Sequence, residues 1–331
     1  MGMVSGPGFV ARVVDRALEV PVVTSFSRVG PVIRRRTAGW ADLDGYRLDG
    51  RVVLVTGATS GLGLAAAQQF VRCGATVVVL GRDAGRVART AEALTSPDGH
   101  GSVEQLVADM GDLDDVRRAA VEFLARHDRL DVLVHNAGAL TADRRVSPQG
   151  LEQTVACQVV GPFLLTSLLL PALCRVAPGR VITVSSGGMY AAALTVSRLQ
   201  MGDDYRGAEQ YARAKRAQVT LNEMWAERVA PGEVVFHSMH PGWADTPGVA
   251  ASLPRFRQVM GPLLRTSAEG ADSIVWLGAD DGAPIKSTGG FWLDRVRRPI
   301  HRLGSTSRSD TPERRRDLWT WVATAAGVDP A

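Results

Sequence analysis

The sequence predicts a three-layer α/β/α fold in one domain, with a doubly wound parallel sheet between two layers of helices. Two patterns carry this prediction. From residue 51 onward, short runs rich in valine and leucine alternate with stretches that have the 3.6-residue period of a helix. These helical stretches lie between the apolar runs, where parallel strands need a crossover. The chain has 331 residues and is 45% hydrophobic, which is enough to fill the core of such a domain.

The strands are expected to be short and almost wholly apolar, because both faces of such a sheet are covered. We expect them at residues 51–57, 75–82, 102–110, 130–138, 180–188, 233–242 and 289–295. The helices between them carry helix signals, such as Gly74 at the end of the first and acidic residues in the first turn of the third. We expect them at residues 61–74, 83–94, 112–127, 150–175, 207–229 and 266–279.

Two segments lie outside this alternation. We assign residues 1–49 to an N-terminal extension, 50–295 to the domain and 296–331 to a basic C-terminal tail. The extension holds an amphipathic helical pattern, followed by three arginines at 34–36. Such a helix can dock on the domain, bind a partner or make peripheral contact with a membrane through residues 1–36. The apolar face of this helix comprises Phe9, Val10, Val13, Val14, Ala17 and Leu18.

Composition excludes several other classes of protein. The net charge is only +4, and no zinc-finger spacing or basic region with heptads is present, so we expect no nucleic-acid partner. Three cysteines without paired spacing indicate free thiols in a reducing compartment, and charges interrupt every early apolar run, so we expect a cytoplasmic protein. The longest apolar run, at 159–173, is short for a membrane span. His237 and His240 have no carboxylate or cysteine at ligand spacing, so no metal site is predicted.

A glycine-rich turn follows the first predicted strand. The stretch "TGATSGLG" contains Gly57, Gly61 and Gly63 and opens the first predicted helix. Glycines at a strand-to-helix turn let the backbone approach a pyrophosphate, and the helix N-terminus offers N–H groups and a positive dipole. The turn therefore predicts a dinucleotide site.

The stretch "YARAK" holds a second candidate for chemistry. Tyr211 and Lys215 lie four residues apart and so on one face of the predicted helix. A phenol has a pKa near ~10, and a nearby cation stabilises its phenolate. We therefore expect Lys215 to lower the pKa of Tyr211 towards the range useful for proton transfer. Lys215 is one of only two lysines in the chain, the other being Lys286.

These motifs, taken together, resemble the short-chain dehydrogenase/reductase superfamily of classical type. The resemblance covers about residues 50–295 and rests on "TGATSGLG", "HNAG" at 135–138, "VSS" at 184–186, "YARAK" and "HPGWADT" at 240–246. Within the superfamily, the sequence looks most similar to the dehydrogenase/reductase member 12 and retinol-dehydrogenase-like group. The resemblance implies a Rossmann-type fold and an alcohol or carbonyl substrate. It also implies that Ser186 binds the substrate oxygen, Tyr211 transfers the proton, and Lys215 tunes Tyr211 and holds the nicotinamide ribose.

The resemblance also implies the residues that bind the coenzyme. They are Gly57, Thr59, Ser60, Gly61, Leu62, Gly63, Arg82, Asp109, Met110, Asn136, Ala137, Gly138, Tyr211, Lys215, Pro241, Gly242 and Thr246. Coenzyme choice depends on the end of the second strand, where Arg82 would attract a 2′-phosphate and Asp83 would bind a 2′-hydroxyl. We favour NADP(H) and keep NAD(H) as the alternative.

Three further features concern catalysis and the substrate. Gln158, in "QVVGPF", stands where the family has an asparagine that holds a water of the proton relay. The insert at 194–206 forms either a wall of the substrate pocket or an exposed loop. Residues 247–264 resemble the family's mobile substrate lid and are apolar, which suggests a lipophilic substrate. A non-catalytic cofactor-binding or regulatory protein on the same fold is the rival function, and a homo-oligomer is left open.

Overall fold

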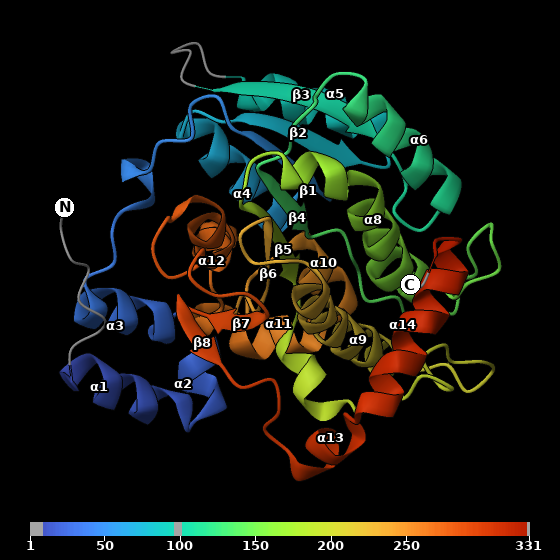
Figure 1. The fold of residues 1–331 in the computed structure, drawn as a ribbon. Coiled ribbons are helices and arrows are strands. Elements are labelled where there is room, and N and C mark those ends of the chain that lie inside the picture. Colours follow the sequence, from blue (N-terminus) through green and yellow to red (C-terminus); the bar gives the residue numbers. More distant parts are fainter. Residues whose placement is uncertain (1–8, 96–100, 330–331) are drawn as a thin grey trace.

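The computed structural model describes residues 9–95 and 101–329. At its centre lies one eight-stranded sheet with the strand order β3-β2-β1-β4-β5-β6-β7-β8 (Figure 1). All neighbouring strands are parallel except β7 and β8, which are antiparallel. The strands are β1 (Val52–Thr56), β2 (Thr76–Gly81), β3 (Ser102–Val107), β4 (Val132–His135), β5 (Gly179–Val184), β6 (Val234–Met239), β7 (Gly290–Leu293) and β8 (Val296–Arg298).

Helices cover both faces of the sheet and bury it in two separate cores. One face packs against α4 (Gly61–Arg72), α5 (Ala84–Leu94) and α12 (Ser267–Ala279). The other packs against α6 (Leu113–Leu124), α8 (Gly161–Cys174), α9 (Gly207–Arg228) and α14 (Pro312–Ala326). The predicted fold class, a doubly wound Rossmann-type sheet in three layers, is confirmed. The strand order reverses direction between β1 and β4, which is the topological switch point of the sheet. Ligands of such sheets bind at the carboxyl ends of the strands at this point.

The predicted helix at residues 150–175 runs from Gln153 to Cys174 and contains a π-helical turn. It consists of α7 (Gln153–Val155), a π-helical turn η2 (Ala156–Val160) and then α8. Gly161 directly follows the π turn. No larger residue fits there, because a Cβ would lie 2.1 Å from the main-chain oxygen of Met110. The stretch Gln153–Cys174 is long and apolar enough to cross a membrane, but 67% of its apolar window is buried inside the protein. Here it serves as a core helix.

The C-terminal residues, described above as a basic tail, are part of the folded body. They form β8, α13 (Gly304–Ser309) and α14. On α14, Leu318 and Val322 are fully buried, and the Trp319 ring lies 4.9 Å from the rings of both Phe163 and Trp225. The arginines of this segment dominate its composition and hide the apolar face, which is why the sequence did not reveal the helix.

The described part of the N-terminal extension forms three short α-helices, α1 (Phe9–Glu19), α2 (Val22–Phe26) and α3 (Val29–Ala38), beside β8 (Figure 1), followed by the 3-10 turn η1 (Leu43–Gly45). Of the three alternatives for the amphipathic helix, docking on the domain is what the structure shows. However, α1 docks through its charged side: Asp15 accepts hydrogen bonds from Arg34 and Arg298 at 2.7 Å. Val10 and Val13 are 70% and 50% exposed. Part of the predicted apolar face therefore points to solvent, whereas Val14 and Leu18 of that face are half-buried.

Candidate active site

Three of the residues expected to carry the chemistry lie together where β5 ends and α9 begins. Ser186 and Tyr211 lie close enough for their side chains to interact, and both remain partly exposed. Lys215 is buried, one turn along α9, and its Nζ lies 5.3 Å from the centre of the Tyr211 ring. The four-residue spacing in the helix thus brings phenol and ammonium together, and the end of the strand supplies the hydroxyl.

Burial controls the protonation of this group. It raises the pKa of Tyr211 to about 12, against the opposing effect of the hydrogen bond with Ser186. It lowers the pKa of Lys215 to about 7, although a nearby Cys157 opposes that shift. Desolvation of the phenolate therefore dominates in this structure and holds the pKa of Tyr211 above its ordinary value, while the expected effect of Lys215 on that pKa stays a prediction.

The glycine turn after β1 has the geometry that a phosphate cradle needs. Gly57 and Gly61 have positive φ angles of 66° and 54°. At Gly63 a Cβ would lie 2.4 Å from both the Gly57 oxygen and the side-chain nitrogen of Asn136. That amide donates hydrogen bonds to the main-chain oxygens of Thr56 and Gly57 at 3.0 and 3.1 Å, which fixes the turn against β4. Backbone, rather than side chain, therefore faces the helix N-terminus, as a bound pyrophosphate requires.

The remaining residues expected at the coenzyme site lie at the carboxyl ends of five parallel strands. Thr59, Ser60, Gly61 and Leu62 follow β1, Arg82 follows β2, Asp109 and Met110 follow β3, Ala137 and Gly138 follow β4, and Pro241, Gly242 and Thr246 follow β6. One long-range contact joins the two sides of this edge: a Cβ at Gly61 would lie 3.3 Å from the Thr246 side chain. Asp109 Oδ1 accepts a hydrogen bond from Gly111 at 2.8 Å.

The two charged residues after β2 have different roles. Asp83 is the N-cap of α5, and its Oδ1 accepts a hydrogen bond from the Arg86 main chain at 2.8 Å. Arg82 is exposed. The carboxylate is engaged in capping the helix, and the guanidinium faces solvent at the edge where a 2′-phosphate would lie.

Gln158 lies in the π turn and is fully buried. Its Nε2 donates a hydrogen bond to the Ala139 oxygen at 2.9 Å, and its side chain packs against Gly138, where a Cβ would lie 2.9 Å from the amide carbon. No protein group within the described residues bonds its Oε1. The π turn, a feature often found at functional sites, thus places a buried amide behind the loop that follows β4.

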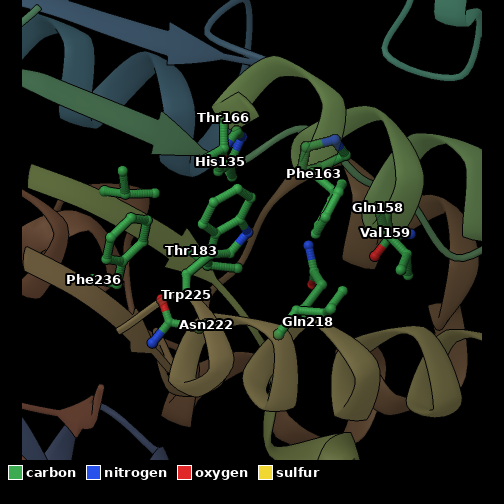
Figure 2. Close-up of a pocket in the computed structure, with 13 residues that line it drawn as sticks. His135, Gln158, Val159, Phe163, Thr166, Thr183, Gln218, Asn222, Trp225 and Phe236 are labelled. Atoms are coloured by element: carbon green, nitrogen blue, oxygen red, sulfur yellow. The ribbon is translucent and has the colours of Figure 1, made fainter. Parts of the chain in front are cut away.

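A small cavity lies between α8, α9 and the sheet (Figure 2). Its volume is about 30 Å³, so it has room for a water molecule but not for a substrate. Gln158 lines one end, and Gln218 points into the space from α9 (Figure 2). His135, whose pKa burial lowers to about 3, lines the sheet side as a neutral ring bonded to Thr166 at 2.8 Å. His135 is therefore a structural residue.

The insert at 194–206 is anchored and not a free loop. Leu194, Leu199 and Met201 are buried. The side chain of Gln210 accepts a hydrogen bond from the Met201 main chain at 2.8 Å and donates one to the Leu199 oxygen at 2.9 Å. Gln210 lies one residue before Tyr211, so the insert is fastened to the start of the catalytic helix.

Sequence reasoning missed one group of residues near the site. Phe26 of α2 packs edge-on against His240, with 4.4 Å between ring centroids, and Arg265 lies against Gly242. Neither residue belongs to a motif with a fixed spacing, so the sequence held no signal for them. Within the described residues, no three histidine, cysteine or acidic side chains gather as a metal site.

The comparison with known proteins agrees with this geometry. Residues 51–255 match the family described as short chain dehydrogenase. The chain belongs to this family. The human dehydrogenase/reductase SDR family member 12 is 36% identical over 268 residues, which are 81% of this chain and 84% of that protein. Bovine retinol dehydrogenase 12 is 30% identical over 256 residues, covering 77% and 81% of the two chains.

A solved structure is similar in fold as well. A protein from Escherichia coli CFT073, described as a short-chain dehydrogenase complexed with NADPH, superimposes with a TM-score of 0.62. The two are 26% identical, and the match covers 77% of this chain and all of that one. Together these comparisons show a short-chain oxidoreductase of the retinol-dehydrogenase-like group, as the motifs predicted.

Proposed function

We propose that this chain is an NADP(H)-dependent oxidoreductase that interconverts a carbonyl and an alcohol through Ser186, Tyr211 and Lys215. The observation that carries the proposal is the close, partly exposed pair Ser186 and Tyr211 beside buried Lys215, whose Nζ lies 5.3 Å from the centre of the Tyr211 ring. This arrangement places a hydrogen-bond donor and a proton donor side by side. A carbonyl oxygen can accept from both at once.

The chain's own residues would act in the following way. Ser186 orients the substrate oxygen and polarises the carbonyl. Tyr211, whose raised pKa keeps it protonated at neutral pH, gives its proton to that oxygen during reduction. Lys215 holds the nicotinamide ribose from its buried position on α9. The bound coenzyme supplies or accepts the hydride. In alcohol oxidation the same tyrosine takes the proton as a phenolate.

NADP(H) is our proposed coenzyme, with NAD(H) as the alternative. Support comes from Arg82, which is exposed at the end of β2 while Asp83 is engaged in capping α5. The residues present fit the coenzyme, since the glycine turn exposes backbone where a phosphate would approach. We assign the adenine and nicotinamide contacts to the loops after β3, β4 and β6, as the family resemblance implies.

We propose a lipophilic substrate, covered by residues 247–264 as a lid. These residues form α10 (Pro247–Ser252), α11 (Pro254–Met260) and the 3-10 turn η4 (Gly261–Leu263). Leu253 and Val259 are 40% and 77% exposed on this segment, and exposed apolar side chains of this kind suit contact with a lipophilic substrate. Closing such a lid would exclude water from the reacting atoms.

Peripheral membrane contact of an otherwise cytoplasmic protein also belongs to this proposal. On α1, exposed Val10 and Val13 lie among Arg12 and Arg16, which are exposed as well. An apolar strip with arginines at its border suits the surface of an anionic bilayer. Val10→Asp with Val13→Asp should abolish flotation with phosphatidylserine vesicles; unchanged flotation would reject this contact.

Coenzyme binding followed by a substrate panel tests the proposed function. Titration should show NADPH binding more tightly than NADH, and NADPH should then be oxidised with at least one aldehyde, ketone or retinal. Coenzyme binding without turnover on any carbonyl or alcohol would favour the rival function, a non-catalytic cofactor-binding protein. Failure to bind either coenzyme would reject both.

A further inference from the structure

The N-terminal extension contacts the catalytic loops through Phe26. This residue is 4% exposed and packs edge-on against both His240 and Trp243, at centroid distances of 4.4 and 5.9 Å. A Cβ at Gly187 would lie 2.8 Å from the Phe26 ring. Gly187 directly follows Ser186, and His240 directly precedes the Pro241–Gly242 turn. One aromatic side chain therefore supports both the loop of the catalytic serine and the loop after β6.

Main-chain hydrogen bonds fasten the same extension to both ends of the lid. Trp243 donates to the Phe26 oxygen at 2.7 Å, just before the lid begins. Arg28 donates to the Leu263 oxygen at 2.9 Å, where the lid ends. The lid, residues 247–264, is thus suspended between two points that share the turn between α2 and α3. Its two anchors would move together if that turn moved.

A buried charge cluster locks this arrangement. Arg265 and Arg34 are 1% and 2% exposed and share the carboxylate of Asp294. Arg265 donates to Asp294 at 2.5 and 3.0 Å, and Arg34 donates to it at 2.6 Å. Arg265 also donates to the main-chain oxygens of Ser25 and Phe26 at 2.8 and 3.0 Å. The extension therefore supplies both an arginine and the carbonyls that this cluster needs.

The cluster reaches the turn expected to hold the coenzyme. Arg265 donates to the Pro241 oxygen at 3.2 Å. Gly242 has a φ of 76°, and a Cβ there would lie 2.2 Å from Arg265 Nε. The backbone of this turn thus packs directly against the Arg265 guanidinium, which in turn donates hydrogen bonds to the main chain of the extension.

We propose that residues 22–36 are a positioning element of the active site: through Phe26 and Arg34 they hold the lid and the Ser186 loop in place for substrate binding. Phe26 and Arg34 touch neither substrate nor coenzyme. The substrate side of this inference rests on the proposed function. The alternative is that the extension stabilises the whole domain without affecting the lid in particular.

Amide hydrogen exchange of the full-length protein separates these accounts. Phe26→Ala should speed exchange at Trp243 and Asp245, and across residues 247–264, by at least tenfold, while α4, α6 and the central strands exchange as in the wild type. Val23→Ala is the matched control, since Val23 lies on the same helix and is 46% exposed. Phe26→Leu, which keeps an apolar side chain, should restore most of the protection.

Arg34→Gln tests the charge cluster, with Arg35→Gln as its control on the same helix. Arg35 bonds only the exposed Asp42 in the described contacts. Arg34→Gln should loosen the same lid amides, and Arg35→Gln should not. Exchange that rises uniformly over the domain in Phe26→Ala and Arg34→Gln would overturn the proposal in favour of general stabilisation. Unchanged lid exchange would overturn it as well.

Kinetics supply the second readout. With a substrate that the wild type turns over, Phe26→Ala should raise KM for that substrate by about tenfold and leave the dissociation constant of NADPH within about twofold. An equal loss of both, or a loss in kcat alone, would contradict a role in holding the lid. If the wild type turns over no substrate, the proposed function fails, but the exchange measurements still decide the role of residues 22–36.

Discussion

Lys215 Nζ donates a hydrogen bond to the main-chain oxygen of Val184 at 2.9 Å. Val184 ends β5, two residues before Ser186, and Ser185 Oγ returns a hydrogen bond to the Lys215 oxygen at 3.3 Å. Helix α9 and the end of strand β5 are therefore joined through the lysine. Besides carrying a charge, Lys215 thus helps to fix the distance between Ser186 and Tyr211.

This relationship predicts that Lys215→Arg is inactive although it keeps a positive charge. The side chain is 3% exposed, and a planar guanidinium would need more room than the single bond to Val184 allows. We expect kcat to fall by at least 100-fold. Lys286→Arg is the control, because Lys286 is the other lysine and is exposed. Steady-state NADPH oxidation measures both, and an active Lys215→Arg variant would show that charge alone suffices.

Arg82 should determine coenzyme preference. Removing it by Arg82→Ala takes away one charge-assisted hydrogen bond to the 2′-phosphate, worth about 1.5–3 kcal/mol or roughly ten- to a hundredfold in affinity. NADH has no phosphate there and should bind as before. Fluorescence titration with both coenzymes measures the change, with Arg86→Ala as the control one turn along α5. Equal weakening of NADPH and NADH would assign Arg82 a structural role.

Gln158 should contribute to proton transfer through its buried amide. Gln158→Leu should lower kcat by tenfold or more. The loss should be smaller than the factor of about 10²–10⁴ that a general acid–base group contributes, because Tyr211 itself remains. Gln158→Asn should keep or raise activity. Gln218→Leu changes the same cavity without touching Gly138 or Ala139 and serves as the control. Wild-type rates in Gln158→Leu would exclude a relay role.

The two directions of the reaction should differ in their pH dependence. Burial raises the pKa of Tyr211 to about 12, so the phenol is protonated from pH 7 to 10. Reduction uses the phenol and should not rise with pH in this range. Oxidation uses the phenolate, whose fraction grows about tenfold per pH unit below its pKa, so the kcat/KM for an alcohol should rise steadily. A flat profile for oxidation from pH 7 to 10 would place the phenolate pKa much lower than burial suggests.

What the sequence could predict followed from local spacing. Tyr211 and Lys215 share a helix face, and the three glycines after β1 shape one turn, so both features are encoded within a few residues. Asp83 shows the limit of local evidence: Arg82 and Asp83 together gave a mixed signal for the coenzyme, and only the structure shows that the Asp83 carboxylate caps α5. The capping role of Asp83 depends only on nearby residues. Predicting it would have required the first residue of α5 to be known to within one position.

What the sequence could not predict depends on contacts between distant residues. Arg34 and Asp294 are 260 positions apart, and only the folded chain shows that they share a buried ion pair. The exposure of Val10 and Val13 on α1 has the same origin, since ion pairs of Asp15 with Arg34 and Arg298 orient the docked helix. Burial of Asp15 raises its pKa, yet the hydrogen bonds and charges of Arg298 and Arg34 outweigh burial and leave the pKa below its ordinary value.

Tyr211→Phe is the substitution that bears most directly on the proposed chemistry. The phenyl ring keeps the packing of α9, and the substitution removes only the hydroxyl beside Ser186. Tyr46→Phe is the matched control, because the Tyr46 hydroxyl bonds Asp280 at 2.8 Å, remote in sequence from every catalytic residue.

The deciding measurement is single-turnover oxidation of bound NADPH by a carbonyl substrate, made beside a titration of NADPH affinity. For Tyr211→Phe we predict a rate at least 100-fold below that of the wild type, from the lower end of the range for proton transfer, with coenzyme affinity unchanged within about twofold. Tyr46→Phe should match the wild type in both. A Tyr211→Phe protein that binds NADPH and turns over within a few-fold of the wild type would contradict the proposed mechanism.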